Sequence, residues 1–511
     1  MKSKLLLTIL ASCFLFILIS CFDHKPSKDN ISELNLTKMK IIGEVDERYQ
    51  SFNIEMCEVI GGDFWIPYNL IDSVRKNSNR TGWAALKWEI PSINLYEKKI
   101  RMLASALGPA YVRVSGTWAN AVYFQDNDEP KLASPPEGYQ NILTREQWKG
   151  VVDFSNAVDG KLVTSFSICD GVRDENGNWT PVQVESMLNY TKSIGGEIEA
   201  VALFNEPSHA SHGNAPKGYN GLNFAKDLVS FKSFVRIAAP EMKIIGPGST
   251  GEYKGIELAR GLSLPTVELL SAEPKPKFDI FSYHYYGNVS KRCMGSQRPE
   301  DALTESWLSQ TELSFKYYGG LRDKYMPGIP IWLTETAEAS CGGNPWAATY
   351  LDSFRYLEQL GRLAKKGVQV VMHNTLARSE YALLDHDTHD PRPSYWTALL
   401  WNRLMGTKVY DTSALTDGVD VFAHNLKNTS KGIAVLIINT QDSEFSVAIP
   451  SSAEQYMITA DKLQTKKIKL NGEELKLTKD GELPAIKGQK IKAGELCLPP
   501  HSITFLSFSE N

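Results

Sequence analysis

The sequence predicts a (β/α)8 barrel followed by an all-β sandwich. Eight short apolar or β-branched runs alternate with helix-period segments or loops, which is typical of a barrel. After Gly406 the pattern changes to short alternating strands, and no helix-period stretch follows. For the first part, a doubly wound open sheet is the alternative on pattern alone. The chain has 511 residues, a length that allows more than one domain at roughly 100–200 residues per domain.

Composition and charge restrict the class of protein. The chain is 42% hydrophobic and 22% charged, which suits a globular protein with a large core. These values exclude a disordered chain, a collagen-like fibre and a small disulfide-stapled scaffold. The 55 basic and 59 acidic residues give a net charge of −4, without long basic blocks. This balance argues against nucleic acid as a partner.

The N-terminus is expected to be a lipoprotein signal peptide, residues 1–20. Lys2 and Lys4 precede an apolar run that is too short for a comfortable membrane span. The run ends in Leu-Ile-Ser-Cys21, which resembles a bacterial lipobox, so Cys21 is expected to carry the lipid. An uncleaved membrane anchor is the alternative. Residues 21–37 are polar and are expected to be a tether to the membrane of the bacterial cell envelope, in the periplasm or at the cell surface.

The barrel is expected over residues 51–405. Helix-period segments are centred on Leu95–Leu107, Phe224–Ala238 and Ala347–Lys366, and Pro181, Pro345 and Pro393 fall where helices can start. The eight strand candidates are Phe52–Cys57, Tyr111–Val114, Leu162–Ile168, Ile198–Phe204, Met242–Gly246, Phe278–Tyr286, Ile329–Thr334 and Val368–His373.

The sandwich is expected over residues 406–511. Its short strands are separated by turn residues, and Asn471-Gly472 is a hairpin signal. Residues 38–50 are expected to hold one more strand, with the sandwich as a candidate place for it.

Two glutamates stand where barrel enzymes place catalytic groups, at the C-terminal ends of strands. The fourth strand runs into Asn205-Glu206-Pro207, and the seventh runs through Thr334 into Glu335. Glycoside hydrolysis needs such a pair, one carboxyl protonated and the other ionised. Two unrelated loop acids are the alternative.

Several runs in this order resemble one family. They are Tyr111-Val-Arg-Val-Ser-Gly-Thr117, Phe204-Asn-Glu-Pro207, Tyr283-His-Tyr-Tyr286, Trp332-Leu-Thr-Glu-Thr-Ala337 with Gly342-Gly343, and Tyr381-Ala-Leu-Leu-Asp385. The chain resembles glycoside hydrolase family 79, the family of heparanase and bacterial β-glucuronidases, within the clan of retaining barrel glycosidases. The resemblance spans about residues 45–410.

The resemblance implies a role for each residue around the scissile bond. Glu206 is then the general acid/base and Glu335 the nucleophile. Tyr285 hydrogen-bonds the nucleophile, and Arg113 keeps it ionised. A structural ion pair inside the barrel is the alternative for Arg113. Asn205 orients the sugar hydroxyl beside the reacting centre.

Further residues are implied in sugar recognition. Glu55 occupies the place of a sugar-contacting acid, with a solvated loop residue as its alternative. Gly342, Gly343 and Tyr381 take the places of the groups that hold the uronate carboxylate. The chain departs from heparanase just before Tyr381, where it reads Ala377-Arg378-Ser379-Glu380. An inward-pointing Glu380 would repel an acidic sugar.

The cysteines and histidines indicate neither a metal site nor a cofactor, because no Cys-x-x-Cys or His-x-x-x-His spacing is present. Cys293 and Cys341 follow strands that are neighbours in a barrel, so we expect a disulfide between them. His284 is interpreted as a structural histidine rather than a proton shuttle.

The function expected from these residues is that of a retaining β-glucuronidase acting on glycans that carry a uronic acid. The alternatives are an endo-acting heparanase-like enzyme, a retaining glycosidase for a neutral sugar, and a non-catalytic glycan-binding lipoprotein.

Overall fold

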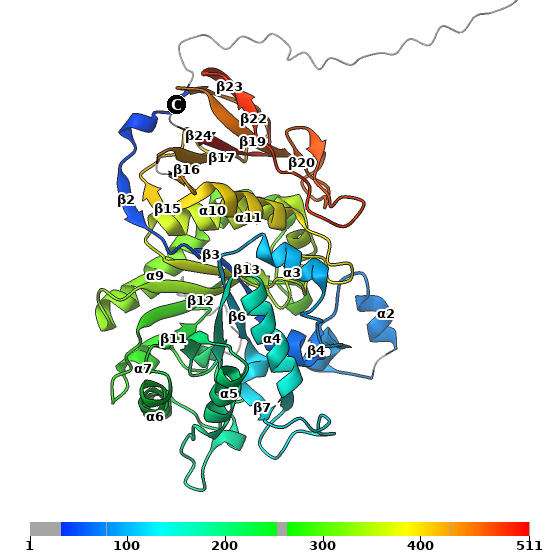
Figure 1. The fold of residues 1–511 in the computed structure, drawn as a ribbon, viewed down its shortest axis with the longest axis vertical. Helices are drawn as coiled ribbons and strands as arrows, with labels where there is room; N and C mark the ends of the chain where they lie inside the picture. The colour runs from blue at the N-terminus through cyan, green and yellow to red at the C-terminus, as the bar shows by residue number, and fades with distance from the viewer. Residues whose placement is uncertain (1–31, 78, 253–262, 430, 510–511) are drawn as a thin grey trace, which may run out of the picture.

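The computed structural model describes residues 32–77, 79–252, 263–429 and 431–509. The expected signal peptide and the expected lipidation site, Cys21, lie outside these residues. Figure 1 shows a barrel in the lower part of the molecule and a layered β domain above it, with α10 and α11 between them.

Eight parallel strands close into the predicted barrel. Each strand pairs with the next barrel strand along the chain, and β14 returns to β3 through the register Val371↔Gln50. This closure excludes the open sheet. In chain order the strands are β3 (Gln50–Glu55), β6 (Ala110–Ser115), β9 (Gly160–Ser165), β10 (Ile198–Ala202), β11 (Lys243–Ser249), β12 (Ile280–Val289), β13 (Ile331–Ser340) and β14 (Val370–His373).

Helices surround the barrel and bury apolar side chains in its core. The side chains of Thr144 and Asn220 cap the first turns of α4 and α6, and Pro393 starts α11, as expected of a residue that lacks an N–H. The principal helices are α3 (Lys98–Ser105), α4 (Arg145–Ala157), α5 (Val182–Ser193), α6 (Gly221–Ala238), α7 (Thr266–Ser271), α8 (Glu305–Leu308), α9 (Gln310–Tyr325), α10 (Tyr350–Lys365) and α11 (Pro393–Leu404).

Two strands run beyond the barrel, which differs from the expectation that the seventh ends at Thr334. β12 and β13 stay paired out to Val289↔Ser340, after a register shift near His284. Glu335 therefore lies within β13 and not after it. Cys293 and Cys341, just past the two strand ends, form the expected disulfide with a Cα–Cα distance of 6.4 Å.

The C-terminal part is the expected sandwich of two sheets. A nine-stranded sheet follows the order β2-β15-β16-β17-β24-β19-β20-β21, with β22 paired to β19, and faces the sheet β1-β18-β23. The strands are β1 (Ser32–Glu33), β2 (Ile41–Glu44), β15 (Met405–Tyr410), β16 (Val419–Leu426), β17 (Ile433–Asn439), β18 (Phe445–Ile449), β19 (Ala453–Thr459), β20 (Lys469–Leu470), β21 (Glu473–Glu474), β22 (Gln489–Ile491), β23 (Gly494–Leu498) and β24 (Ser502–Phe508).

The N-terminal residues that the structure describes belong to this sandwich. β2 pairs with β15, which settles the place of the strand expected in residues 38–50. β1 pairs with β18, and Leu34 is only 2% exposed between the two sheets. The tether expected to reach residue 37 is therefore wrong at its C-terminal end, because the apolar Leu34 adds to the sandwich core.

A hairpin insertion follows the first barrel strand. It runs from α1 (Met56–Ile60) into β4 (Gly62–Trp65) and returns through α2 (Ile71–Lys76), η2 (Gly82–Leu86) and β5 (Lys87–Ile90). Figure 1 shows β4 and α2 projecting at one side of the barrel.

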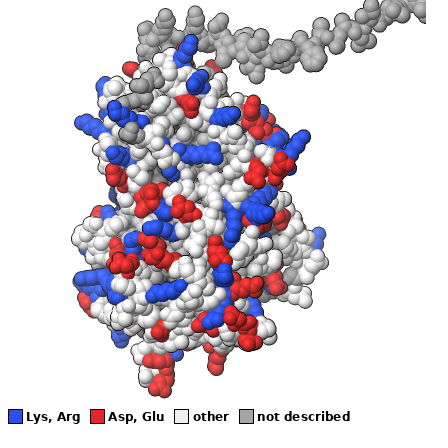
Figure 2. Space-filling view, in the orientation of Figure 1, with Lys and Arg blue, Asp and Glu red and all other residues white. Residues whose placement is uncertain are grey.

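Charges of both signs are mixed over the face shown in Figure 2. Within the described residues, no helix is both long and apolar enough to cross a membrane.

Candidate active site

Glu206 is placed at the barrel mouth by a sharp turn after β10. Its backbone is left-handed, with φ of 49°, and Pro207 then begins the short helix η5 (Pro207–His209). The side chain of Asn120 holds this turn, because its amide donates to the Asn205 carbonyl at 2.9 Å and its oxygen accepts from the Asn205 N–H at 2.8 Å. The strand end therefore presents the Glu206 carboxyl in a fixed direction.

Glu335 is 5% exposed and has two firm partners. The Arg113 guanidinium donates to its Oε2 at 2.9 Å, and the Tyr286 hydroxyl donates to its Oε1 at 2.5 Å. These two donors fix the orientation of the carboxyl group, and hydrogen bonds from a guanidinium to a carboxylate are among the stronger ones in proteins. Arg113 also donates to the side-chain oxygen of Asn205 at 2.7 Å. The side-chain NH2 group of Asn205 therefore points away from Arg113.

The expectation for Tyr285 is wrong, because the hydroxyl on Glu335 belongs to Tyr286. Side chains alternate along a strand, so His284 and Tyr286 share the face that meets Glu335. Tyr285 lies on the opposite face of β12, within electrostatic range of the buried Arg355 of α10. The sequence run Tyr-His-Tyr-Tyr contains two adjacent tyrosines, and only the register of β12 with β13 decides which of them faces Glu335.

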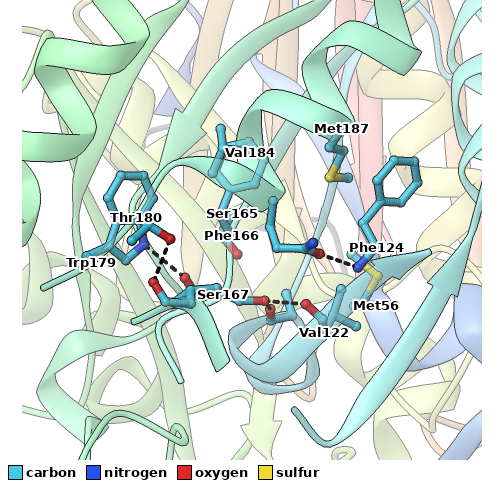
Figure 3. Close-up of a pocket in the computed structure, with 13 residues that line it drawn as sticks. Met56, Val122, Phe124, Ser165, Phe166, Ser167, Trp179, Thr180, Val184 and Met187 are labelled. Carbon is cyan, nitrogen blue, oxygen red and sulfur yellow. Dashed lines mark hydrogen bonds between the residues drawn. The ribbon is translucent and has the colours of Figure 1, made fainter. Parts of the chain in front are cut away.

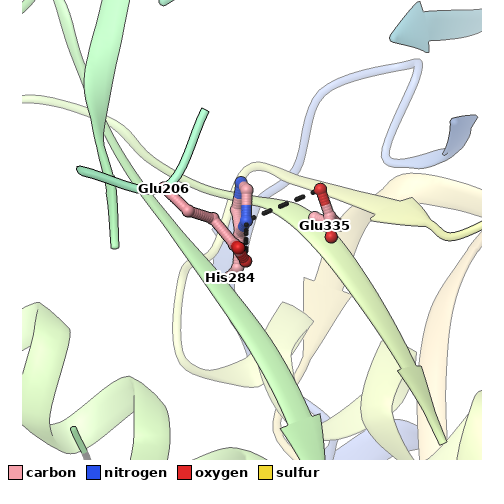
Figure 4. Close-up of side chains that lie close together, drawn as sticks. All are labelled: Glu206, His284 and Glu335. Carbon is pink, nitrogen blue, oxygen red and sulfur yellow. Dashed lines mark hydrogen bonds and ion pairs between the residues drawn. The ribbon is translucent and has the colours of Figure 1, made fainter. Parts of the chain in front are cut away.

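His284 lies between the two carboxyls (Figure 4). Its Nδ1 is 3.0 Å from Glu206 Oε1 and 3.6 Å from Glu335 Oε2, and its Nε2 is 3.5 Å from Arg113 Nη2. Burial raises the pKa of Glu206, but the hydrogen bond and charge of His284 outweigh it, so the pKa lies below its usual value. His284 therefore belongs to the site, although its sequence context suggested a purely structural histidine.

The two carboxyls are close together. Their nearest oxygens and His284 Nδ1 all lie within 4.8 Å of one another. Retaining glycosidases keep the carboxyl groups about 5–5.5 Å apart, whereas inverting enzymes need about 6.5–9.5 Å to admit a water molecule. The separation favours direct attack by one carboxylate on the sugar. The same three groups are potential metal ligands, but Arg113 donates to Glu335 Oε2 and would face a cation bound there.

Glu55 lies beside this pair and is 6% exposed. Burial and the nearby charge of Glu335 raise its pKa well above its usual value, against the hydrogen bond that Asn374 donates to it at 2.9 Å. The same amide nitrogen lies 3.0 Å from the Tyr286 hydroxyl and 3.3 Å from the Tyr381 hydroxyl, which share its second N–H. Asn374, which the sequence did not single out, thus joins three of the side chains at the mouth.

The glycine loop differs from its expected role. The Gly343 N–H donates to the Ala339 carbonyl at 3.1 Å, so in this structure it is not free to hold a carboxylate. The cause is the tight turn at the end of β13, where Cys341, Gly342 and Gly343 all have positive φ. For the Gly342 N–H, the expected role stays a prediction.

Glu380 does not stand as an unpaired acid. Its Oε2 accepts from the Arg292 guanidinium at 2.9 Å, and its Oε1 accepts from the Tyr68 N–H at 3.0 Å. Arg378 is half-buried and donates to the His386 carbonyl at 3.3 Å. The buried ion pair removes the repulsion that an inward Glu380 would exert on an acidic sugar.

A cavity of about 20 Å³ lies beside the barrel, lined by Met56, Ser165, Ser167, Trp179 and further side chains (Figure 3). It holds at most a water molecule and is far too small for a sugar ring. The Trp179 indole donates to the Ser167 carbonyl at 3.3 Å, which accounts for that tryptophan as a packing residue.

Comparisons with known proteins identify relatives of this chain. The chain matches no protein-family model. It is 33% identical to a baicalin-β-D-glucuronidase from Scutellaria baicalensis, over 91% of this chain and 90% of that protein. It is 26% identical to mouse heparanase, over 80% and 85%, and 25% identical to a hyaluronoglucuronidase from the leech Hirudo nipponia, over 82% and 90%.

Solved structures agree in fold. A 4-O-α-L-rhamnosyl-β-D-glucuronidase from Fusarium oxysporum superposes with a TM-score of 0.61 at 11% identity, covering 94% of this chain and 99% of that one. A family 51 arabinofuranosidase from Xanthomonas axonopodis has a TM-score of 0.58 at 15% identity, covering 94% and 100%. With the sequence relatives and the paired carboxyls, the chain belongs to glycoside hydrolase family 79, the family of the heparanases and β-glucuronidases.

Proposed function

We propose that this protein is a retaining β-glucuronidase, and that Glu335 is its nucleophile and Glu206 its acid/base. The observation that carries the proposal is that an oxygen of Glu206 and an oxygen of Glu335 lie within 4.8 Å of each other, while Arg113 and Tyr286 donate hydrogen bonds to Glu335. Family membership supports the same chemistry.

In the first step, Glu335 attacks the anomeric carbon while Glu206 gives its proton to the glycosidic oxygen. The carbon–oxygen bond to the leaving group breaks, and a glycosyl ester forms on Glu335. In the second step, Glu206 takes a proton from water, whose oxygen attacks the same carbon and releases Glu335. Two inversions at one carbon give net retention.

Glu206 must carry a proton to act in the first step. Burial raises its pKa, but the hydrogen bond and charge of His284 lower it below its usual value, so that the carboxylate form is favoured. A bound sugar that reaches the Glu206 oxygen competes for the contact with His284. Loss of that hydrogen bond removes the largest of the effects that lower the pKa, so the pKa of the acid rises toward the value that proton donation requires.

The uronate preference is supported by the hydroxyl of Tyr381 and by the neutralisation of Glu380. Tyr381 is buried at the mouth, and its hydroxyl accepts from Asn374 at 3.3 Å, so its own proton is available to a substrate oxygen. A pocket whose donors match a carboxylate leaves them unpaired with a neutral sugar, at about 1–3 kcal/mol for each donor.

A panel of chromogenic β-glucuronide, galacturonide, xyloside and glucoside substrates tests the proposal. We expect kcat/KM for the glucuronide to exceed that for the glucoside by at least about a hundredfold, or about 2.7 kcal/mol. Tyr381→Phe is expected to reduce this preference by lowering the rate on the glucuronide. NMR of the first-formed product should show the retained anomer. Equal rates on the two sugars contradict the uronate preference, and an inverted product contradicts the mechanism.

We also propose that the protein is exported and anchored through a lipid on Cys21, in the cell envelope. The support is the sequence alone, with two lysines, an apolar run and a lipobox-like end. Metabolic labelling with a radioactive fatty acid should label the wild-type chain and not Cys21→Ser. Label retained in that variant contradicts the anchor.

A further inference from the structure

The hairpin after β3 carries an ammonium group between two tryptophans. Lys87 begins β5 and pairs in register with Trp65 of β4. Its Nζ lies 5.2 Å from the Trp65 ring centroid and 4.8 Å from that of Trp118. Trp118 belongs to η3 (Thr117–Ala121), which follows β6. Both distances are those of cation–π contacts.

This hairpin is fixed against the barrel mouth. The Arg292 guanidinium donates to the Ile66 carbonyl at 2.8 and 3.1 Å and to Glu380 at 2.9 Å. The Phe64 ring lies 5.4 Å from that of Trp118. A Cβ on Gly342 would come within 2.9 Å of the Trp65 Cβ, so the hairpin abuts the loop that follows β13. Lys87 is therefore held by packing on both sides and does not belong to a loose surface loop.

Among the residues that the structure describes, Lys87 forms no ion pair. Asp63, its acidic neighbour on the hairpin, pairs with Arg80 at 2.5 Å. Glu55 is within electrostatic range of Lys87 but not in ion-pair contact. Burial lowers the pKa of Lys87, against the nearby Cys57, Asp63 and Glu55. A half-buried ammonium with rings on two sides and no counterion is suited to receive an anion.

The position of Lys87 in the barrel indicates which side of the substrate it faces. Glu206 follows β10 and must stand over the leaving-group oxygen. Lys87 and Trp118 come from the loops after β3 and β6, and β9 separates β6 from β10 in the barrel. Lys87 therefore stands on the side of the barrel mouth that holds Glu55, and not beside the strand that carries Glu206. Trp83, which is 57% exposed and packs 6.5 Å from Trp65, extends an aromatic surface beside it.

We propose that Lys87, held by Trp65 and Trp118, binds the carboxylate of a uronic acid on the nonreducing side of the scissile bond. This inference rests on the proposed glucuronidase function and adds a specificity residue to it. This carboxylate belongs either to the glucuronyl unit that Glu335 attacks or to a uronic acid attached to the nonreducing end of that unit. We call the sugar at that nonreducing end the leading sugar. The recognising chemistry is the same, a desolvated ammonium against a carboxylate.

Lys87→Met tests the proposal, since methionine keeps the stem between the rings and removes the charge. One arm compares an aryl β-glucuronide with the aryl β-glucoside. The other compares two disaccharide aryl glucuronides, whose leading sugar is either a uronic acid or the matching neutral hexose. We expect a loss of about tenfold or more in kcat/KM on the acidic member of one pair, and less than about threefold on its neutral member.

A loss in the first arm identifies the attacked sugar as the source, and a loss in the second arm alone identifies the leading sugar. Lys87→Arg should restore most of the lost rate. Lys324→Met is the matched control, because Lys324 lies 5.0 Å from the Tyr325 ring at the far end of α9, and it should change nothing.

Equal losses on the acidic and neutral members of both pairs overturn the proposal, since a lysine that only balances Glu55 acts on every substrate. No loss in either arm overturns it as well. A wild-type protein that hydrolyses no glucuronide overturns the proposed function and this inference with it. Wild-type activity on the glucuronide with an unaffected Lys87→Met overturns the inference alone.

Discussion

Replacing Tyr286 with phenylalanine removes one hydroxyl from the partners of Glu335. That hydroxyl donates to Glu335 at 2.5 Å, and Arg113 remains as the other close donor. The substitution should slow the second chemical step. In that step Glu335 changes from a neutral ester to a departing carboxylate, and each hydrogen-bond donor stabilises the negative charge that develops on it. In the first step the carboxylate loses charge, so the same hydrogen bond gives the transition state no advantage.

The magnitude follows from the contact. A hydrogen bond to a fully charged group contributes about 1.5–3 kcal/mol. A carboxylate with about half a charge in the transition state gains about half of that, or about 4- to 13-fold in rate. With an aryl glucuronide of good leaving group, we expect kcat to fall by this factor in Tyr286→Phe. We expect KM to fall with it, because the glycosyl-enzyme accumulates.

Stopped-flow measurement of the aryl alcohol burst checks this expectation, and intact-protein mass spectrometry shows the accumulated glycosyl-enzyme. Tyr285→Phe is the matched control, since its hydroxyl lies on the other face of β12, and its kcat should stay within about twofold of the wild type. A larger effect in Tyr285→Phe than in Tyr286→Phe would refute the placement of Tyr286. An unchanged kcat in Tyr286→Phe would refute the role of its hydroxyl.

Three further predictions concern the same protein. Glu206→Ala should slow substrates with poor leaving groups far more than activated phenyl glucuronides, because a good leaving group needs little protonation; equal losses in kcat/KM count against the acid role. Gly116→Ala should strongly reduce activity, because at φ of 97° the new Cβ overlaps the Glu55 carboxylate; unchanged kinetics with a correctly folded variant would contradict this packing. Thermal stability should fall as the pH rises from about 6.5 to about 8, because three buried acids keep their proton in the folded state and lose it when unfolded. Burial raises their pKa values to about 7, about 7 and about 8, in Glu58, Glu338 and Glu358. Below about pH 6.5 the buried His373 and His424 act in the opposite direction, because burial lowers their pKa values to about 3 and about 4. Calorimetry at about pH 6.5 and pH 8 checks the expected fall, and Glu338→Gln should show a smaller fall than the wild type.

The sequence alone predicts the barrel, the sandwich and the two carboxyls that we propose as catalytic. Strand and helix periodicity is local, and a barrel needs no more than eight such units in order. Glu206 and Glu335 are identified because each interrupts or follows an apolar run that has to be buried. The disulfide follows from neighbouring strands once the barrel is assumed. These features depend on spacing along the chain, so the sequence contains them directly.

Only the tertiary structure decides which side chains converge between those carboxyls. The register of β12 against β13 selects Tyr286 over Tyr285 and turns His284 toward both acids, and a shift of one residue would reverse the choice. The ion pair of Glu380 with Arg292 joins residues 88 positions apart, and local sequence says nothing of such a partner. The same holds for Lys87, whose two tryptophans come from different loops. Contacts between distant segments depend on how the strands close into a barrel, and a local sequence pattern does not predict them.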